Sequence, residues 1–251
     1  TYPCRFENAF VPDVGDLEAL ITDKTVAILY NFPSNPTGAT VNTDQRDMLV
    51  AFAAKHDLWI VTDEVYDKIV YGGDHVSFLG AGYDRVIMLN SFSKTFAMTG
   101  WRIGYVLSPN SEAMQQVTKM QYYVTACSND AMQYAVLAAM EQASDYPGKM
   151  RDEFQTRRDL ICSRLNEMDG VSCHVPDGAF YVFPKIDVGG MSSEELAMEM
   201  LSEGVLCSPG SAFGEAGEGH LRFAYTISKP DIDRGMDRVA KVIERISGKR
   251  D

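Results

Sequence analysis

The sequence has few of the residues that build metal sites and disulfide frameworks. Its 251 residues include five cysteines and four histidines. The cysteines are odd in number, scattered and without CxxC spacing, and no two histidines stand at metal-ligand spacing. This pattern argues against a disulfide framework or a zinc site and favours reduced thiols. We therefore expect no metal centre and a cytoplasmic location.

Basic charge and long apolar runs are also scarce. The formal net charge is −12, with 23 Lys and Arg against 35 Asp and Glu. An acidic chain is a poor partner for nucleic acid or an anionic membrane, and we expect neither. No apolar run is long enough to span a bilayer. At 45% hydrophobic residues the composition is that of a globular protein with one or two domains.

The first part of the chain alternates strands with helical patterns. Short apolar runs bounded by turn residues predict buried strands at 26–30, 58–61, 86–89 and 103–107. A capped helical pattern over 43–53 lies between the first two strands. This order predicts the α/β class, with a mostly parallel sheet and flanking helices.

The remainder predicts a small α+β domain. Helices are expected at 111–124, 129–143 and 150–168, with a break at Tyr146-Pro147-Gly148. Paired strands at 171–174 and 179–183, a helix at 192–201, strands at 205–207 and 221–225, and a helix at 231–246 follow. We expect a partial large domain over residues 1–148 and a small C-terminal domain over 149–251.

The segment Ser91-Phe92-Ser93-Lys94 follows the third predicted strand. Lys94 thus lies past the carboxyl end of a strand, where open α/β sheets bind ligands. The hydroxyl of Ser91 and the guanidinium of Arg102 can bind an anion there. A lysine beside a phosphate site suggests an amine that forms an imine with a phosphorylated aldehyde. The alternative is a surface lysine in a polar turn.

Polar side chains also follow the first two strands. Asn35 lies in a string of turn formers and precedes Pro36 in a candidate cis bond, although an ordinary loop is an alternative. Asp63 needs a partner if it is buried, and the alternative is that it is the N-cap of a helix that begins at Glu64. Asn35 and Tyr66 can donate to a phenolate oxygen, and Asp63 can keep a ring nitrogen protonated. Together with Lys94, this set meets the requirements of a pyridoxal phosphate site.

These motifs resemble those of the class I/II aminotransferases, the aspartate aminotransferase-like enzymes with the type I pyridoxal phosphate fold. The segments that carry the resemblance are Asn35-Pro36-Thr37-Gly38, Asp63-Glu64-Val65-Tyr66, Ser91-Phe92-Ser93-Lys94, Gly100-Trp101-Arg102-Ile103-Gly104, Gly178-Ala179-Phe180-Tyr181, Pro209 to Gly214, and Leu221-Arg222-Phe223. The resemblance implies that Lys94 condenses with pyridoxal phosphate, Asp63 binds the ring nitrogen, Asn35 and Tyr66 the ring hydroxyl, Ser91 and Arg102 the phosphate, and Arg222 the substrate carboxylate. For Arg222 the alternative is a structural ion pair.

The resemblance further implies transamination from an L-amino acid to a 2-oxo acid, by a homodimer of a longer chain. Members of the family begin well upstream, so we expect the 251 residues alone to be a weakly active or inactive fragment. Two alternatives remain open: a pyridoxal phosphate-dependent β-eliminating lyase of the same fold, and the non-catalytic effector module of a regulator. The identity of the amino acid also remains open.

Overall fold

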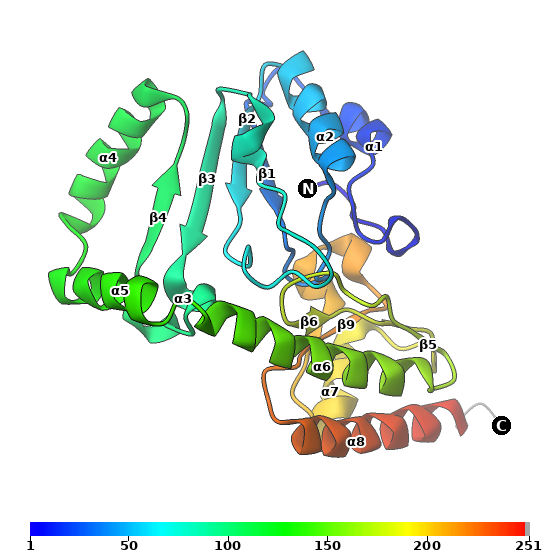
Figure 1. Cartoon of the computed structure of the whole chain (residues 1–251). Coiled ribbons are helices and arrows are strands. Elements are labelled where there is room, and N and C mark those ends of the chain that lie inside the picture. Colours follow the sequence, from blue (N-terminus) through cyan, green and yellow to red (C-terminus); the bar gives the residue numbers. More distant parts are fainter. Residues whose placement is uncertain (249–251) are drawn as a thin grey trace. The chain divides into compact units, whose positions relative to one another are not determined.

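Two units make up the chain in the computed structural model, which describes residues 1–248 (Figure 1). We call residues 17–33 and 40–151 the sheet unit, and residues 1–16, 34–39 and 152–251 the C-terminal unit. The expected boundary at 148 lies close to this division, but the first 16 residues and 34–39 group with the C-terminal part. The first 16 residues group with the C-terminal part because Phe10 is buried there: it is 4% exposed, and its ring centroid lies 5.8 Å from that of Phe183.

The sheet unit is built around strands in the order β1-β2-β3-β4, side by side in Figure 1. They are β1 (Ala27–Asn31), β2 (Trp59–Asp63), β3 (Val86–Ser91) and β4 (Gly104–Leu107). The first three pair in parallel, whereas β4 runs antiparallel to β3. The predicted α/β class with a mostly parallel sheet is therefore confirmed, and the carboxyl ends of β1, β2 and β3 meet at one edge.

The two faces of this sheet carry different polar groups at that edge. Asp63 pairs with Leu89 in the parallel register. Since side chains alternate between faces, Asp63 and Ser91 lie on one face, whereas Glu64 and Asn90 point to the other. The second face is the buried one, because both Glu64 and Asn90 are almost inaccessible to solvent.

The helices up to the division of the chain are α1 (Val14–Leu20), α2 (Thr43–Lys55), α3 (Phe92–Thr95), α4 (Ser111–Thr125), α5 (Asp130–Gln142) and α6 (Tyr146–Asn166). Asn42 and Gln45 form a reciprocal capping box that begins α2. The predicted break at residues 146–148 is wrong. Pro147 and Gly148 lie in the first turn of α6 instead, where proline has no intrahelical hydrogen bond to lose.

The C-terminal unit contains short antiparallel strands. β5 (Val171–Ser172) pairs with β7 (Lys185–Ile186), while β6 (Tyr181–Val182) and β8 (Ser208–Pro209) pair with β9 (Leu221–Ala224). The predicted pairing of 171–174 with 179–183 is therefore wrong. The turn between them does not close a hairpin, because Gly178 N donates to the carbonyl oxygen of Gly38 at 2.9 Å. The strand expected at 205–207 is also wrong, since β8 begins after it.

Two helices complete this unit, α7 (Ser193–Ser202) and α8 (Lys229–Ser247). An ion pair joins the two helices, with Arg245 on α8 2.8 Å from Glu199 on α7. A second ion pair joins α8 to α6, with Arg164 on α6 2.9 Å from Asp233 on α8. Among the described residues, no helix is both long and apolar enough to cross a membrane.

Candidate active site

Asp63 ends β2 with a carboxylate that has a single local partner. Its Oδ1 accepts a hydrogen bond from Val65 N at 3.2 Å, as an aspartate that begins a turn does. No other side-chain hydrogen bond or ion pair of Asp63 occurs within residues 1–248. Burial raises the pKa of Asp63, against the effect of the Val65 bond, and the charge of Glu64 raises it further. A carboxylate in this state would be stabilised by a cationic N–H donor.

Lys94 lies in α3, the turn that directly follows β3. Its Nζ is 5.8 Å from the ring centroid of Tyr66, a residue that is 3% exposed. Burial lowers the pKa of the Lys94 amine, and the positive charge of Arg102 lowers it further. The neutral amine is the nucleophilic form, so this environment favours attack on a carbonyl carbon. The half-buried position of Lys94 is not that of a surface lysine.

Ser91 organises the start of α3. Its Oγ accepts from Ser93 N at 3.1 Å and lies 2.8 Å from Ser93 Oγ and 3.0 Å from the carbonyl oxygen of Ile103. The strand β4 returns very close to this point, because a Cβ on Gly104 would lie 2.6 Å from Asn90 O. The second glycine of the Gly100-to-Gly104 motif thus allows β4 to pair beside Ser91.

Arg102 and Arg222 have no acidic partner within the described residues. Most other arginines have one: ion pairs join Arg46 to Asp47, Arg85 to Asp57, Arg157 to Glu153, Arg158 to Asp159, Arg164 to Asp233, and Arg245 to Glu199. Arg102 instead donates to the carbonyl oxygen of Thr99 at 3.0 Å. A guanidinium is always charged at neutral pH, so each of these two can neutralise an anion from outside the chain.

Arg222 is held by neutral groups of the C-terminal unit. Its Nη1 donates to Asn35 Oδ1 at 2.8 Å, and its Nη2 donates to Ser208 Oγ at 3.0 Å. Its guanidinium carbon lies 4.8 Å from the ring centroid of Tyr181 and 5.0 Å from that of Phe213. The alternative of a structural ion pair for Arg222 is therefore not what the structure contains.

The turn that carries Asn35 depends on a glycine. Gly38 has a φ of +70°, and a Cβ there would lie 2.3 Å from Pro176 Cβ and 2.8 Å from Gly178 O. Gly38 N donates to Ser34 O at 2.9 Å and closes the turn. The bond between Asn35 and Pro36 is cis, as the sequence suggested.

The predicted site residues thus form two groups, each described within its own unit. The sheet unit carries Asp63, Tyr66, Ser91, Lys94 and Arg102, and the C-terminal unit carries Asn35 and Arg222. The profile of the family "Aminotransferase class I and II" matches residues 1–239. The chain belongs to this family. Class I and II aminotransferases depend on pyridoxal phosphate, and the donors and acceptors described above suit that cofactor.

Named relatives agree with this assignment. The chain is 40% identical over 248 residues to aromatic-amino-acid aminotransferase 2 of Thermococcus litoralis, covering 96% of this chain and 63% of the relative. It is also 40% identical over 247 residues to an aspartate aminotransferase of Pyrococcus abyssi, covering 96% and 63%. The chain therefore spans about 63% of the length of these relatives.

Solved structures share the fold. An aromatic aminotransferase from Pyrococcus horikoshii superposes with a TM-score of 0.92 at 38% identity, covering 97% of this chain and 66% of that one. An aspartate aminotransferase from Thermus thermophilus with maleate gives a TM-score of 0.88 at 32% identity, covering 94% and 62%. The type I aminotransferase fold that the motifs implied is confirmed, with this chain forming part of it.

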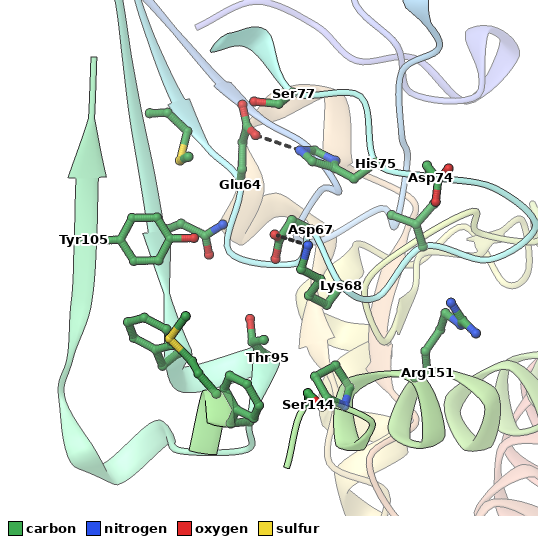
Figure 2. A pocket seen from close by; sticks show the side chains of 18 of the residues that line it. Glu64, Asp67, Lys68, Asp74, His75, Ser77, Thr95, Tyr105, Ser144 and Arg151 are labelled. Atoms are coloured by element: carbon green, nitrogen blue, oxygen red, sulfur yellow. Dashed lines mark hydrogen bonds and ion pairs between the residues drawn. The ribbon is translucent and has the colours of Figure 1, made fainter. Parts of the chain in front are cut away.

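The opposite face of the aminotransferase sheet bears a cavity of about 720 Å³, lined by both polar and apolar side chains, that the sequence did not predict (Figure 2). Glu64, only 1% exposed, accepts hydrogen bonds from His75 Nε2 at 2.7 Å and from Phe78 N at 3.1 Å. None of the predicted site residues lines this cavity, because Asp63 and Glu64 point to opposite faces. No cluster of at least three metal-ligating side chains occurs in the part of the chain that the structure describes.

Sequence reasoning also missed the groups around Arg222. Tyr181 comes from one segment and Ser208 and Phe213 from a later one, and each is an unremarkable residue type in its own segment. The one available signal was their presence in or beside the motifs at 178–181 and 209–214.

Proposed function

We propose that the protein that carries this chain is a pyridoxal phosphate-dependent aminotransferase, moving an amino group from an L-amino acid to a 2-oxo acid. One observation carries the proposal: Asp63 ends β2 and Lys94 lies just after the neighbouring parallel strand β3, and their pKa values shift in opposite directions, down for the amine and up for the carboxyl. Perturbed groups of this kind at strand ends are typical of active sites. The relatives named aspartate and aromatic-amino-acid aminotransferases support the same reaction class.

Each predicted residue then has a role at a stated atom. Bound pyridoxal phosphate supplies an aldehyde carbon and a protonated ring that accepts an electron pair. Asp63 would hold the proton on the ring nitrogen with the carboxylate oxygen that Val65 does not use. Tyr66 and Asn35 would donate to the ring hydroxyl, and Ser91 and Arg102 would bind the phosphate. Arg222 would bind the α-carboxylate of the substrate with its unused N–H groups.

Lys94 has two tasks in this scheme. Its amine would hold the cofactor, and would be released when the substrate amine takes its place. The released Nζ would then take the proton from the substrate Cα, as general base, and deliver it, as general acid, to the carbon that the cofactor supplies as its aldehyde. A lowered pKa serves both tasks, because more of the amine is neutral near physiological pH.

The remaining expectations stay predictions: a homodimer, a cytoplasmic location, and weak activity of the 251 residues alone. A β-eliminating lyase would use the same residues. Product analysis separates the two, since a transaminase releases a 2-oxo acid and retains the amino group on the cofactor, whereas the lyase releases ammonia and pyruvate.

Borohydride trapping tests the proposal on both the full-length protein and the 251-residue chain. We expect reduction in the presence of pyridoxal phosphate to label Lys94, with a visible absorbance band before reduction. Lys94→Ala should abolish the band and the label, while the exposed Lys185→Ala should change neither. Labels spread evenly over surface lysines of the full-length protein would refute the proposal.

A further inference from the structure

We infer that Tyr181 and Phe213 form an aromatic clamp that positions the guanidinium of Arg222 for a carboxylate. The two are positioning residues, since they act on the ligand through Arg222. The choice of ligand, the substrate α-carboxylate, rests on the proposed function. The clamp itself rests on contacts within the C-terminal unit.

The two rings come from different segments and differ in exposure. Tyr181 lies in β6 and is 9% exposed, whereas Phe213 ends the 3-10 helix Gly210–Phe213 and is 38% exposed. The guanidinium carbon of Arg222 is within 5.0 Å of both ring centroids, inside the range of a cation–π contact. The guanidinium therefore lies against one buried ring in a strand and one exposed ring at the end of a short 3-10 helix.

Hydrogen-bond donors of Arg222 remain available for a ligand. A guanidinium side chain carries five N–H groups in a planar fork. Asn35 and Ser208 accept one bond each, and no other acceptor for Arg222 occurs among the described residues. Three N–H groups are left, and a carboxylate needs two parallel ones for a bidentate pair. A guanidinium in contact with two rings has fewer orientations available to it, so the fork faces a ligand in fewer arrangements.

A second arginine of the same unit shows the structural alternative. Arg157 lies 5.6 Å from the ring centroid of Phe154, but its Nε also donates to Glu153 at 2.8 Å. The Phe154 ring thus contacts an arginine whose charge is already neutralised by Glu153. Arg222 has two rings and no acid, which is the arrangement expected if its charge is kept for an external anion.

The loss of carboxylate affinity on removing a ring depends on how often the Arg222 guanidinium occupies the orientation that the rings stabilise. An exposed cation–π contact stabilises that orientation by a factor of roughly 2 to 5. Because a ligand binds only the competent orientation, the loss of one ring weakens binding by at most about that factor. Loss of both rings should weaken it by at most roughly 25-fold, if the two contributions are independent.

The test measures carboxylate binding at Arg222 itself, in the full-length protein and in the 251-residue chain. The probe is succinate, followed by the NMR signal of the Arg222 Nε–H group, which is assigned by its loss in Arg222→Lys. Phe213→Leu should raise the dissociation constant of succinate about 2- to 5-fold. Phe213→Tyr restores a ring and should bind as the parent does.

Two controls separate positioning from a general structural defect. Phe154→Leu makes the same chemical change beside Arg157 and should leave succinate binding unchanged. Succinamide, which has the same skeleton without charge, should bind equally to the parent and to Phe213→Leu. The exposure of Phe213 makes its replacement tolerable to the fold, and the amide spectrum verifies this.

The outcomes distinguish this inference from the proposed function. No response of Arg222 to succinate, or equal affinity in the parent and Phe213→Leu, overturns the clamp even if Lys94 is labelled by pyridoxal phosphate. The expected loss and its rescue by Phe213→Tyr support the clamp even if Lys94 is not labelled, in which case the proposed function fails.

Discussion

Replacing Asn35 with aspartate tests whether the unpaired charge of Arg222 binds the substrate. Asn35 Oδ1 already accepts a hydrogen bond from Arg222 Nη1 at 2.8 Å, and Asn35 is exposed. Asn35→Asp is nearly isosteric, so the new carboxylate would keep that bond and add a negative charge beside the guanidinium. A carboxylate ligand of Arg222 would then meet a competing anion.

The magnitude follows from Coulomb's law. Two carboxylates that share one guanidinium lie roughly 5 Å apart, and at effective dielectric constants of about 20 to 80 they repel each other by about 0.8 to 3.3 kcal/mol. Carboxylate affinity should fall between roughly fourfold and a few hundredfold. The same change should raise the free energy of unfolding by only about 0 to 1 kcal/mol, because the new ion pair is exposed.

The assay is a succinate titration of Asn35→Asp and of the parent at neutral pH, with urea unfolding of both. Asn42→Asp adds the same charge at the N-cap of α2 and keeps a capping side chain, so it controls for net charge. Unchanged or tighter succinate binding in Asn35→Asp, with the control like the parent, would refute the idea that the free charge of Arg222 binds carboxylates.

Three further predictions concern stability. Burial lowers the pKa of Lys94 in the folded chain, so between that lowered pKa and the ordinary value of 10.5 the unfolded chain binds more protons than the folded one. The free energy of unfolding should therefore rise with pH over this range. Urea titrations should show that Lys94→Met removes this rise. Gly38→Ala should lower the free energy of unfolding by at least roughly 1 to 3 kcal/mol in thermal unfolding, because Gly38 has a left-handed φ and an added Cβ would lie 2.3 Å from Pro176 Cβ. Gly219→Ala should lower it less, because Gly219 has a similar φ but no neighbour within 4 Å. Glu64→Ala should cost about 1 to 3 kcal/mol in urea unfolding, because buried donors lose their acceptor; an unchanged midpoint would contradict the role of this buried carboxylate.

Local signals were sufficient to predict the edge of the sheet where the polar side chains lie. Apolar runs of strand length predicted β1, β2 and β3, and in a parallel sheet their carboxyl ends must meet at the same edge. The placement of Asp63 and Lys94 beyond neighbouring strands therefore followed without knowledge of the pairing. The alternation of side chains along a strand also places Asp63 and Glu64 on opposite faces of the sheet.

Pairing between distant segments was not readable in the same way. The turn before Ala179 predicted a hairpin, but Gly178 instead bonds to Gly38, far away in the sequence. Hairpin prediction assumes that a turn serves its own two strands, and short strands carry too little pattern to show otherwise. The contact between Phe10 and Phe183 was not readable for the same reason, because the two rings pack together in the core although they are distant in the sequence.

Arg222 shows how the two kinds of information divide. By itself the sequence determined that an arginine lies in a half-buried strand of the C-terminal unit, within a family motif, and that its guanidinium is charged at neutral pH. Only the tertiary structure decided that neutral Asn35 and Ser208 hold that charge and that no acid cancels it. The physical reason is that residue type determines the charge, whereas its partners are brought to it by the packing of segments that are distant in sequence.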